Sequence, residues 1–129
     1  MSKTVAIIDD EAEMEFIYSV MLDVPVKKGL IDLKFFSDSE EFFTWFQTHR
    51  PDLILSDINM PNISGPDILR RVRNAGRSIP TYLVSGYEES NYRQIIQDLE
   101  VRRFLTKPLN FNKVCTFIEL DLGLRSANL

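Results

Sequence analysis

The chain has 129 residues, of which 44% are hydrophobic and 11% aromatic, so it is long enough to bury about two thirds of its unfolded surface in one domain. Fifteen basic and nineteen acidic residues give a net charge of -4, which excludes the basic excess that drives proteins onto nucleic acid, and a single cysteine, Cys115, excludes an internal disulfide. Because the sequence has neither a leader pattern nor an apolar run of about eighteen residues, we expect one cytoplasmic domain over residues 1–129 that contacts neither membrane nor nucleic acid.

Five short segments rich in aliphatic or aromatic residues alternate with segments that have helical spacing, a pattern typical of alternating strands and helices. The expected strands are VAII (5–8), DLKFF (32–36), LILS (53–56), TYLVS (81–85) and RFL (103–105). The first and third are apolar on both faces, which is typical of central parallel strands with helices on either side. We therefore expect an α/β fold, a single-domain (βα)5 unit with a doubly wound parallel sheet.

Apolar spacing and capping residues place the expected helices. A cap in SDSE precedes an expected helix over 39–48, and SGP places Pro66 in the first turn of another. A helix near the N-terminus is expected to bury side chains that recur at i, i+3, i+4 and i+7, namely Ile17, Val20, Met21 and Val24. The last helix is expected to bury Phe111, Val114, Cys115, Ile118 and Leu122.

Three aspartates stand where the first and third strands end, Asp9 and Asp10 after VAII and Asp57 after LILS. In an open parallel sheet ligands bind beyond the carboxyl ends of the strands, so neighbouring strands bring these carboxylates into one crevice. The residues alone leave two interpretations open for Asp9 and Asp10, capping of the following helix or chemistry. Capping suits Asp57 less well, because the next helix is expected to begin several residues later, near Ser64 or Pro66.

A cluster of three carboxylates needs a cation. Unit charges about 4 Å apart repel by about 4 kcal/mol at an effective dielectric constant of about 20, so the cluster is costly unless a hard divalent ion relieves it. A small set of oxygen ligands favours Mg²⁺, which keeps several waters and commonly bridges carboxylates to phosphate. We therefore expect Mg²⁺ as the cofactor at this edge of the sheet.

The fourth and fifth strands end in groups suited to phosphate. TYLVS ends in the hydroxyl of Ser85, followed by Gly86, which lets a backbone amide approach a ligand closely. RFL leads to Lys107, whose ammonium is a point charge for phosphate oxygens. Taken singly, Ser85 is an ordinary turn residue and Lys107 an ordinary exposed lysine. Together with the acids they form the set that phosphoryl transfer to a carboxylate requires, a nucleophile, metal ligands and neutralising donors.

The motifs IDDE, DINMPNISG, VSG and TKP, in this order and spacing, resemble the response-regulator receiver domain of two-component signalling, over residues 4 to about 122. The resemblance implies a flavodoxin-like fold with strand order 2-1-3-4-5, a core over 4–122 and a short C-terminal tail over 123–129. It implies phosphotransfer from a sensor histidine kinase or phosphotransfer protein, and signalling to a downstream protein partner or a fused output domain. It also implies that the protein is no enzyme beyond its own phosphorylation and dephosphorylation.

The resemblance also assigns roles to the acidic residues. Asp57 is the implied phosphoacceptor, in a reaction that depends on Mg²⁺. The implied metal ligands are Asp10, Asp57 and the backbone carbonyl of Asn59, with Asp9 acting partly through water.

By the same resemblance Ser85 and Lys107 contact the phosphoryl group, Phe104 occupies the aromatic switch position, and a cis bond precedes Pro108. Serine at position 85 replaces the more common threonine but keeps the hydroxyl. We expect Ser85 to move toward the phosphate and the ring of Phe104 to fill the space that it leaves, which alters a distant protein-interaction face.

Two segments depart from the family pattern. LEVRRFL lacks the Gly-Ala often found before the fifth strand, which leaves the end of the fourth helix undefined. EEFFTWF places Phe42, Phe43, Trp45 and Phe46 where the family mostly has small or aliphatic residues. We expect these rings in the core, with one of them left exposed, because four aromatic residues in five positions exceed one helical face.

Two other functions stay open. A haloacid dehalogenase-like phosphatase also forms an aspartyl phosphate, but it typically has a second aspartate two residues after the nucleophile, where this chain has Asn59. A receiver-like interaction module that takes no phosphate usually lacks an acidic or lysine position, and here all are present. The RSANL segment after the last helix is compatible with a stand-alone regulator or with a receiver cut from a longer protein.

Overall fold

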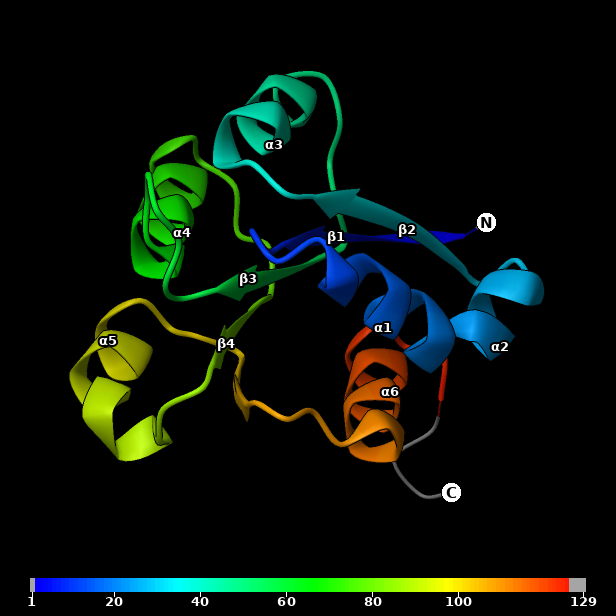
Figure 1. Cartoon of the computed structure of the whole chain (residues 1–129). Coiled ribbons are helices and arrows are strands. Elements are labelled where there is room, and N and C mark those ends of the chain that lie inside the picture. The colour runs from blue at the N-terminus through cyan, green and yellow to red at the C-terminus, as the bar shows by residue number, and fades with distance from the viewer. Residues whose placement is uncertain (1, 126–129) are drawn as a thin grey trace.

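The computed structural model describes residues 2–125, which form a parallel sheet flanked by helices (Figure 1). The strands are β1 (Lys3–Ile8), β2 (Ile31–Phe36), β3 (Leu53–Asp57), β4 (Thr81–Ser85) and β5 (Arg103–Thr106). The helices are α1 (Glu13–Met21), α2 (Asp23–Lys27), α3 (Ser39–Phe46), α4 (Gly65–Asn74), α5 (Arg93–Asp98) and α6 (Phe111–Asp121), with a 3-10 turn, η1 (Glu89–Tyr92). Of the expected tail, residues 126–129 lie outside the described residues. Within residues 2–125 no helix has the length and apolar character that a membrane span requires.

The described strands form one parallel sheet in the order β2-β1-β3-β4-β5, which confirms the expected topology. Every expected strand is present, and its observed bounds differ from the expected ones by at most two residues. β1 and β3 are neighbours, with Ile7 opposite Leu55 and Ile8 opposite Ser56. The carboxyl ends of these two strands, and the acids that follow them, therefore reach the same edge of the sheet.

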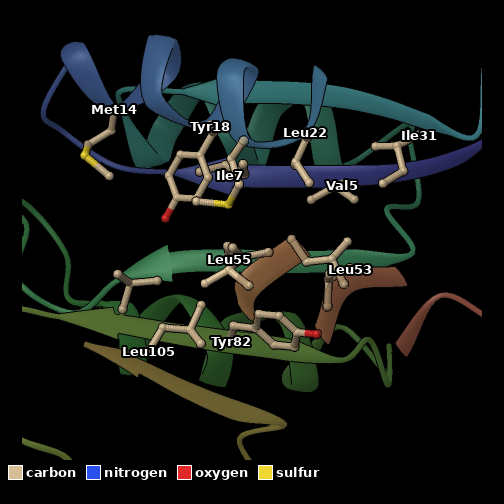
Figure 2. Packing of buried hydrophobic residues seen from close by; sticks show 14 of the residues in the cluster. Val5, Ile7, Met14, Tyr18, Leu22, Ile31, Leu53, Leu55, Tyr82 and Leu105 are labelled. Carbon is tan, nitrogen blue, oxygen red and sulfur yellow. The ribbon is translucent and has the colours of Figure 1, made fainter. Parts of the chain in front are cut away.

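Alternate side chains of the central strands enter two separate cores. Val5 and Ile7 pack in one cluster with side chains of α1 and α6, whereas Ala6 and Ile8 pack in another with side chains of α3 and α4. Figure 2 shows the first cluster, where the ring of Tyr18 from α1 lies against β1. Both faces of residues 5–8 in β1 and of β3 are covered, and the runs VAII and LIL at their centres are apolar, as a doubly wound sheet requires.

α1 turns a different face to the sheet from the one that spacing predicted. Its fully buried side chains are Met14, Tyr18 and Met21, whereas Val20 and Val24 are 49% and 60% exposed. The predicted face was therefore wrong, except for Met21 and the partly buried Ile17. Val24 lies outside α1, which ends at Met21. Within α1 the core contacts the side that carries Met14, Tyr18 and Met21, so Val20 on another side stays exposed.

The predicted helix starts are confirmed. The Asp38 side chain caps α3 by accepting the N–H of Glu40, and the Ser64 hydroxyl caps α4 by accepting the N–H of Asp67, with Pro66 in the first turn. α3 ends at Phe46, two residues earlier than expected. These local signals were correct because a cap acts through hydrogen bonds to residues two or three positions away.

The buried face of α6 is narrower than predicted. Val114, Ile118 and Leu122 are buried, but Phe111 is 40% exposed and Cys115 is half-buried. Phe111 and Cys115 line a surface groove between α6 and the α1–α2 segment, so they cover only the rim of the core.

The aromatic residues of α3 lie in the core, as expected, but none of the four is exposed. Phe42 and Phe46 are buried and stacked at 5.3 Å between ring centroids, and Phe43 and Trp45 are half-buried. The guanidinium of Arg71 lies 3.7 Å from the centre of the Phe43 ring. Arg71 of α4 covers Phe43, and Trp45 packs against Phe36 and His49, so no ring on this helix is exposed, contrary to the expectation.

α5 ends in a residue with left-handed backbone that is not glycine. Glu100 has a φ of 52°, and the N–H of Val101 donates to the carbonyl of Ile96 at 3.0 Å while that of Glu100 donates to Gln97 at 3.3 Å. This is the hydrogen-bond pattern of a helix end that glycine usually occupies. The end of α5, which the sequence left undefined, therefore uses the same turn as a glycine would. A side chain in this conformation has a steric cost of about 1 kcal/mol.

Glu100→Gly should raise the free energy of unfolding by about 0.5–1 kcal/mol, because it removes this steric cost from an exposed position. Urea unfolding followed by circular dichroism measures the change. Gly76→Ala is the matched control, since Gly76 has a φ of 78° and open space around it. This substitution should lower the free energy of unfolding by a similar amount. A less stable Glu100→Gly protein would contradict the assignment.

Asp121 of α6 forms hydrogen bonds with residues of β4 and β5 and with Arg102, which precedes β5. Its carboxylate accepts hydrogen bonds from Arg102 at 2.9 Å, from Arg103 at 2.7 and 3.1 Å, and from the phenol of Tyr82. Burial raises the pKa of Asp121, but the bonds from Arg103, Arg102 and Tyr82 outweigh burial and lower it from 3.8 to about 2. The ionised carboxylate therefore stabilises the junction of β4, β5 and α6.

Asp121→Asn should lower the free energy of unfolding by about 2 kcal/mol at pH 7, because charge-assisted bonds become neutral and one acceptor oxygen is replaced by a donor. A carboxyl whose folded pKa is depressed stabilises the fold above its unfolded pKa and loses this effect as the pH falls through its folded pKa. The difference between wild type and variant should thus be full above about pH 4 and shrink toward pH 2 in urea unfolding. A difference that stays constant over this range would contradict the role of the charge.

Candidate functional site

The polar residues named from the sequence converge at the carboxyl edge of the sheet. Asp9 follows β1, Asp57 ends β3, Ser85 ends β4 and Lys107 follows β5. In the register of the sheet Asp57 pairs with Val84, the residue before Ser85, and Ser85 pairs with Thr106, the residue before Lys107. Parallel strands in the order β1-β3-β4-β5 therefore place four chemically different side chains in one row.

The three aspartates form one cluster. Asp9, Asp10 and Asp57 each offer a carboxylate oxygen, and these oxygens all lie within 4.8 Å of one another. Asp9 and Asp57 are only 1% and 7% exposed, whereas Asp10 is exposed at the rim. Three oxygen ligands with one open side form a donor set that suits a hard divalent cation such as Mg²⁺.

Helix capping does not account for these acids. The N-cap of α1 is Ala12, without a side-chain hydrogen bond, and the cap of α4 is Ser64. Asp9 accepts the N–H of Glu11 at 3.0 Å, and Asp57 accepts the N–H of Asn59 at 3.3 Å, so one oxygen of each is oriented by the chain two residues further on. The alternative that the sequence left open for Asp9 and Asp10 is therefore not the one that the fold adopts.

Lys107 is the cation of the cluster. Its Nζ lies 3.2 Å from Asp9 Oδ2, 3.3 Å from Glu11 Oε1 and 3.4 Å from Asp57 Oδ2. With its side chain 20% exposed, the ammonium lies at the mouth of the pocket and faces solvent on one side. The contact with Glu11 was missed from the sequence, although its position beside the two aspartates in IDDE was a signal for it.

Burial and charge act in opposite directions on these groups. Burial raises the pKa values of Asp57 and Asp9 above the ordinary value of an aspartate, although Lys107 and the backbone donors act to lower them. Burial lowers the pKa of Lys107, but the charges of Asp9 and Asp57 outweigh burial and hold it above its ordinary value. The lysine is therefore a permanent positive charge at the cluster.

Ser85 is fully buried and has two hydrogen-bond partners, one close and one at the outer limit of hydrogen-bond distance. Its Oγ accepts the N–H of Tyr87 at 3.0 Å, and its hydroxyl donates to the phenol oxygen of Tyr92 at 3.5 Å. The ring of Tyr92 stacks on the half-buried Phe104, with 5.4 Å between centroids. The two residues of the expected switch are thus connected through Tyr92 of η1, to which no sequence motif points.

The loop after Asp57 is shaped by a glycine. A Cβ built on Gly65 would lie 2.6 Å from the carbonyl oxygen of Asp57, closer than non-bonded atoms approach, and the N–H of Gly65 donates to Ile58 at 2.9 Å. Only glycine therefore lets α4 begin directly against the end of β3. The SGP segment contained this signal, but it was interpreted only as a helix start. The expected cis bond between Lys107 and Pro108 is confirmed.

Comparison with known proteins gives a consistent family. A family model described as the response regulator receiver domain matches residues 5–119. The alkaline phosphatase synthesis transcriptional regulatory protein PhoP of Bacillus subtilis is 24% identical over 114 residues, which are 88% of this chain and 46% of that protein. The transcriptional regulatory protein DltR of Streptococcus agalactiae is 29% identical over 112 residues, 87% of this chain and 48% of that protein. The chain thus spans about half the length of these curated relatives.

Solved structures share the fold. The receiver domain of the Francisella response regulator 1452 superposes with a TM-score of 0.81 at 18% identity, over 95% of this chain and 98% of that one. The chemotaxis response regulator CheY4 of Vibrio cholerae superposes with a TM-score of 0.79 at 20% identity, over 94% and 99%. At these identities the likeness concerns the fold alone.

Proposed function

The chain belongs to the response regulator receiver domain family of two-component signalling, and from this premise we propose that Asp57 is its phosphoacceptor. The observation that carries the proposal is the position of Lys107 Nζ, within 3.4 Å of a buried Asp57 oxygen, in a cluster with Asp9 and Asp10. Asp57 combines a nucleophilic oxygen with a neighbouring cation and a second oxygen held by the N–H of Asn59.

The transfer itself is a displacement at phosphorus. An Asp57 oxygen forms a bond to the phosphorus of a phosphohistidine while the P–N bond breaks, and the departing imidazole nitrogen takes up a proton. Lys107 and the Ser85 hydroxyl then donate to phosphoryl oxygens, whose negative charge the pocket must neutralise. Little covalent chemistry falls to the chain beyond presenting the carboxylate and neutralising charge.

The oxygen donors also fit Mg²⁺, with Asp10, Asp57 and the backbone carbonyl of Asn59 as ligands and Asp9 acting partly through water. Asp10 is exposed to solvent, and the buried Asp9 and Asp57 add negative charge that would attract a cation. When bound, Mg²⁺ would supply positive charge that offsets the negative charge of the carboxylates and of the phosphoryl oxygens. Lys107 contacts Asp9 and Asp57 and would complete the neutralisation of these carboxylates.

We infer that the donor is a sensor histidine kinase or a phosphotransfer protein, and that the signal leaves through Ser85 and Phe104 to a downstream protein or a fused output domain in the cytoplasm. The named relatives are transcriptional regulators. With a net charge of -4, this chain works through protein contact rather than through DNA, and it turns over no substrate besides its own phosphate.

Asp57→Asn should abolish labelling. Treatment with acetyl phosphate and Mg²⁺ should add one phosphate to the wild type and none to the variant in intact-mass spectra, because an amide oxygen is a far weaker nucleophile than a carboxylate. Asp67→Asn, at an exposed acid on α4, is the control and should be labelled like the wild type. Labelling of Asp57→Asn would refute the assignment, and steady hydrolysis of p-nitrophenyl phosphate would favour the phosphatase alternative instead.

Mg²⁺ should stabilise the fold by relieving the repulsion among the three carboxylates. At ten times its dissociation constant the ion contributes about 1.4 kcal/mol, which is about 4 °C in melting temperature for a domain of this size. Asp10→Ala should lose most of this shift, yet melt no lower than the wild type in chelator, since it removes one of the repelling charges. Asp23→Ala, an exposed acid on α2 paired with Lys27, should keep the full shift. Identical melting of the wild type in Mg²⁺ and in chelator would exclude the metal site.

A further inference from the structure

Tyr92 connects the two residues on which the proposed switch depends. Ser85 has no exposed surface, and its hydroxyl donates to the Tyr92 phenol oxygen at 3.5 Å. The Tyr92 ring stacks on Phe104 at an angle of 29°. We propose that Tyr92 is a positioning residue that holds the Ser85 hydroxyl away from the phosphoryl site until phosphorylation draws it off, an inference that rests on the proposed function of Asp57.

The Ser85 hydroxyl can donate only one hydrogen bond. A serine hydroxyl has one hydrogen and two lone pairs. One lone pair accepts the N–H of Tyr87 at 3.0 Å, which leaves the hydrogen for a single acceptor, and in this structure that acceptor is Tyr92. A phosphoryl oxygen on Asp57 is a charged acceptor and competes for the same hydrogen. Ser85 therefore cannot donate to both at once, and because its contact with Tyr92 is already 3.5 Å long, a shift of Ser85 toward the phosphoryl group breaks that contact.

The segment that carries Tyr92 is poorly anchored. Tyr92 ends η1 and directly precedes α5, and among the described residues 89–98 none is fully buried. By contrast, every residue of β4 is buried. Loss of the hydroxyl contact thus acts on a part of the fold with little packing to resist movement.

Tyr92 also changes the role of Phe104. Phe104 has no hydroxyl that could bond Ser85. The hydroxyl that contacts Ser85 comes from Tyr92 in η1 instead of from β5. The Phe104 ring contacts this pair through its stack with Tyr92. The signal consequently runs from β4 to η1 and α5 first, and reaches β5 through the stacked rings.

The test measures binding of beryllofluoride, a stable phosphoryl mimic, in the presence of Mg²⁺ by titration calorimetry on the full chain. Tyr92→Phe keeps the ring and removes the competing oxygen, so it should bind beryllofluoride about two- to fivefold more tightly than the wild type, the effect of one weak neutral hydrogen bond. Tyr87→Phe removes the same atom from a ring that is 62% exposed and should leave the affinity unchanged. In a Ser85→Ala background, Tyr92→Phe should have no effect, because the competition needs the serine hydroxyl.

Tyr92→Leu removes both the hydroxyl and the ring, so its comparison with Tyr92→Phe separates their effects. It should show the same gain in affinity, while the amide shifts of residues 103–106 on addition of beryllofluoride should shrink in nuclear magnetic resonance spectra, because the stack on Phe104 is gone. Amide spectra without ligand verify that each variant is folded.

Unchanged affinity of Tyr92→Phe, or a gain that persists without the Ser85 hydroxyl, would overturn the role of Tyr92 while leaving Asp57 as phosphoacceptor. Failure of the wild type to bind beryllofluoride would instead refute the proposed function, and the inference about Tyr92 with it.

Discussion

The convergence of negative charge at the carboxyl edge of the sheet is the constraint on which the rest of the site depends. Asp9 and Asp57 are buried beside each other, and each carboxylate pair at about 4 Å carries a repulsion of about 4 kcal/mol at an effective dielectric constant of about 20. Lys107 offsets part of this repulsion through contacts of 3.2 and 3.4 Å to the two acids. The remaining negative charge favours a divalent cation, and the site is thereby prepared for a phosphoryl group.

The central strands are tightly packed, whereas the η1–α5 segment is loosely packed. β1, β3 and β4 are buried on both faces and hold Asp57 and Ser85 at fixed strand ends, whereas η1 and α5 bury no side chain fully. The same asymmetry appears at the helix ends, since α5 closes with the strained Glu100 while Ser64 caps α4 and Gly65 lets it begin close to β3. A small change at the buried site is therefore most easily expressed in the η1–α5 segment.

Local signals predicted what local forces decide. Strand segments followed from apolar runs, and helix starts followed from Asp38 and Ser64, because their side chains bond backbone groups two or three residues away. The buried face of α1 was predicted wrongly, since apolar residues occur on more than one side of it and only contact with β1 selects Tyr18. The helical period is a necessary condition for burial, but it does not choose among several apolar faces.

The sequence by itself determined the order of strands and helices and the chemical types at the strand ends, acid, acid, hydroxyl and amine, because these depend on composition and short-range spacing. Only the tertiary structure decided which of these groups meet. Lys107 reaches Asp9 across 98 positions of sequence and Asp57 across 50, and the contact of Ser85 with Tyr92 depends on where the chain after β4 places η1. Such contacts are set by sheet order and packing, which act between distant segments, so no local pattern in the chain encodes them.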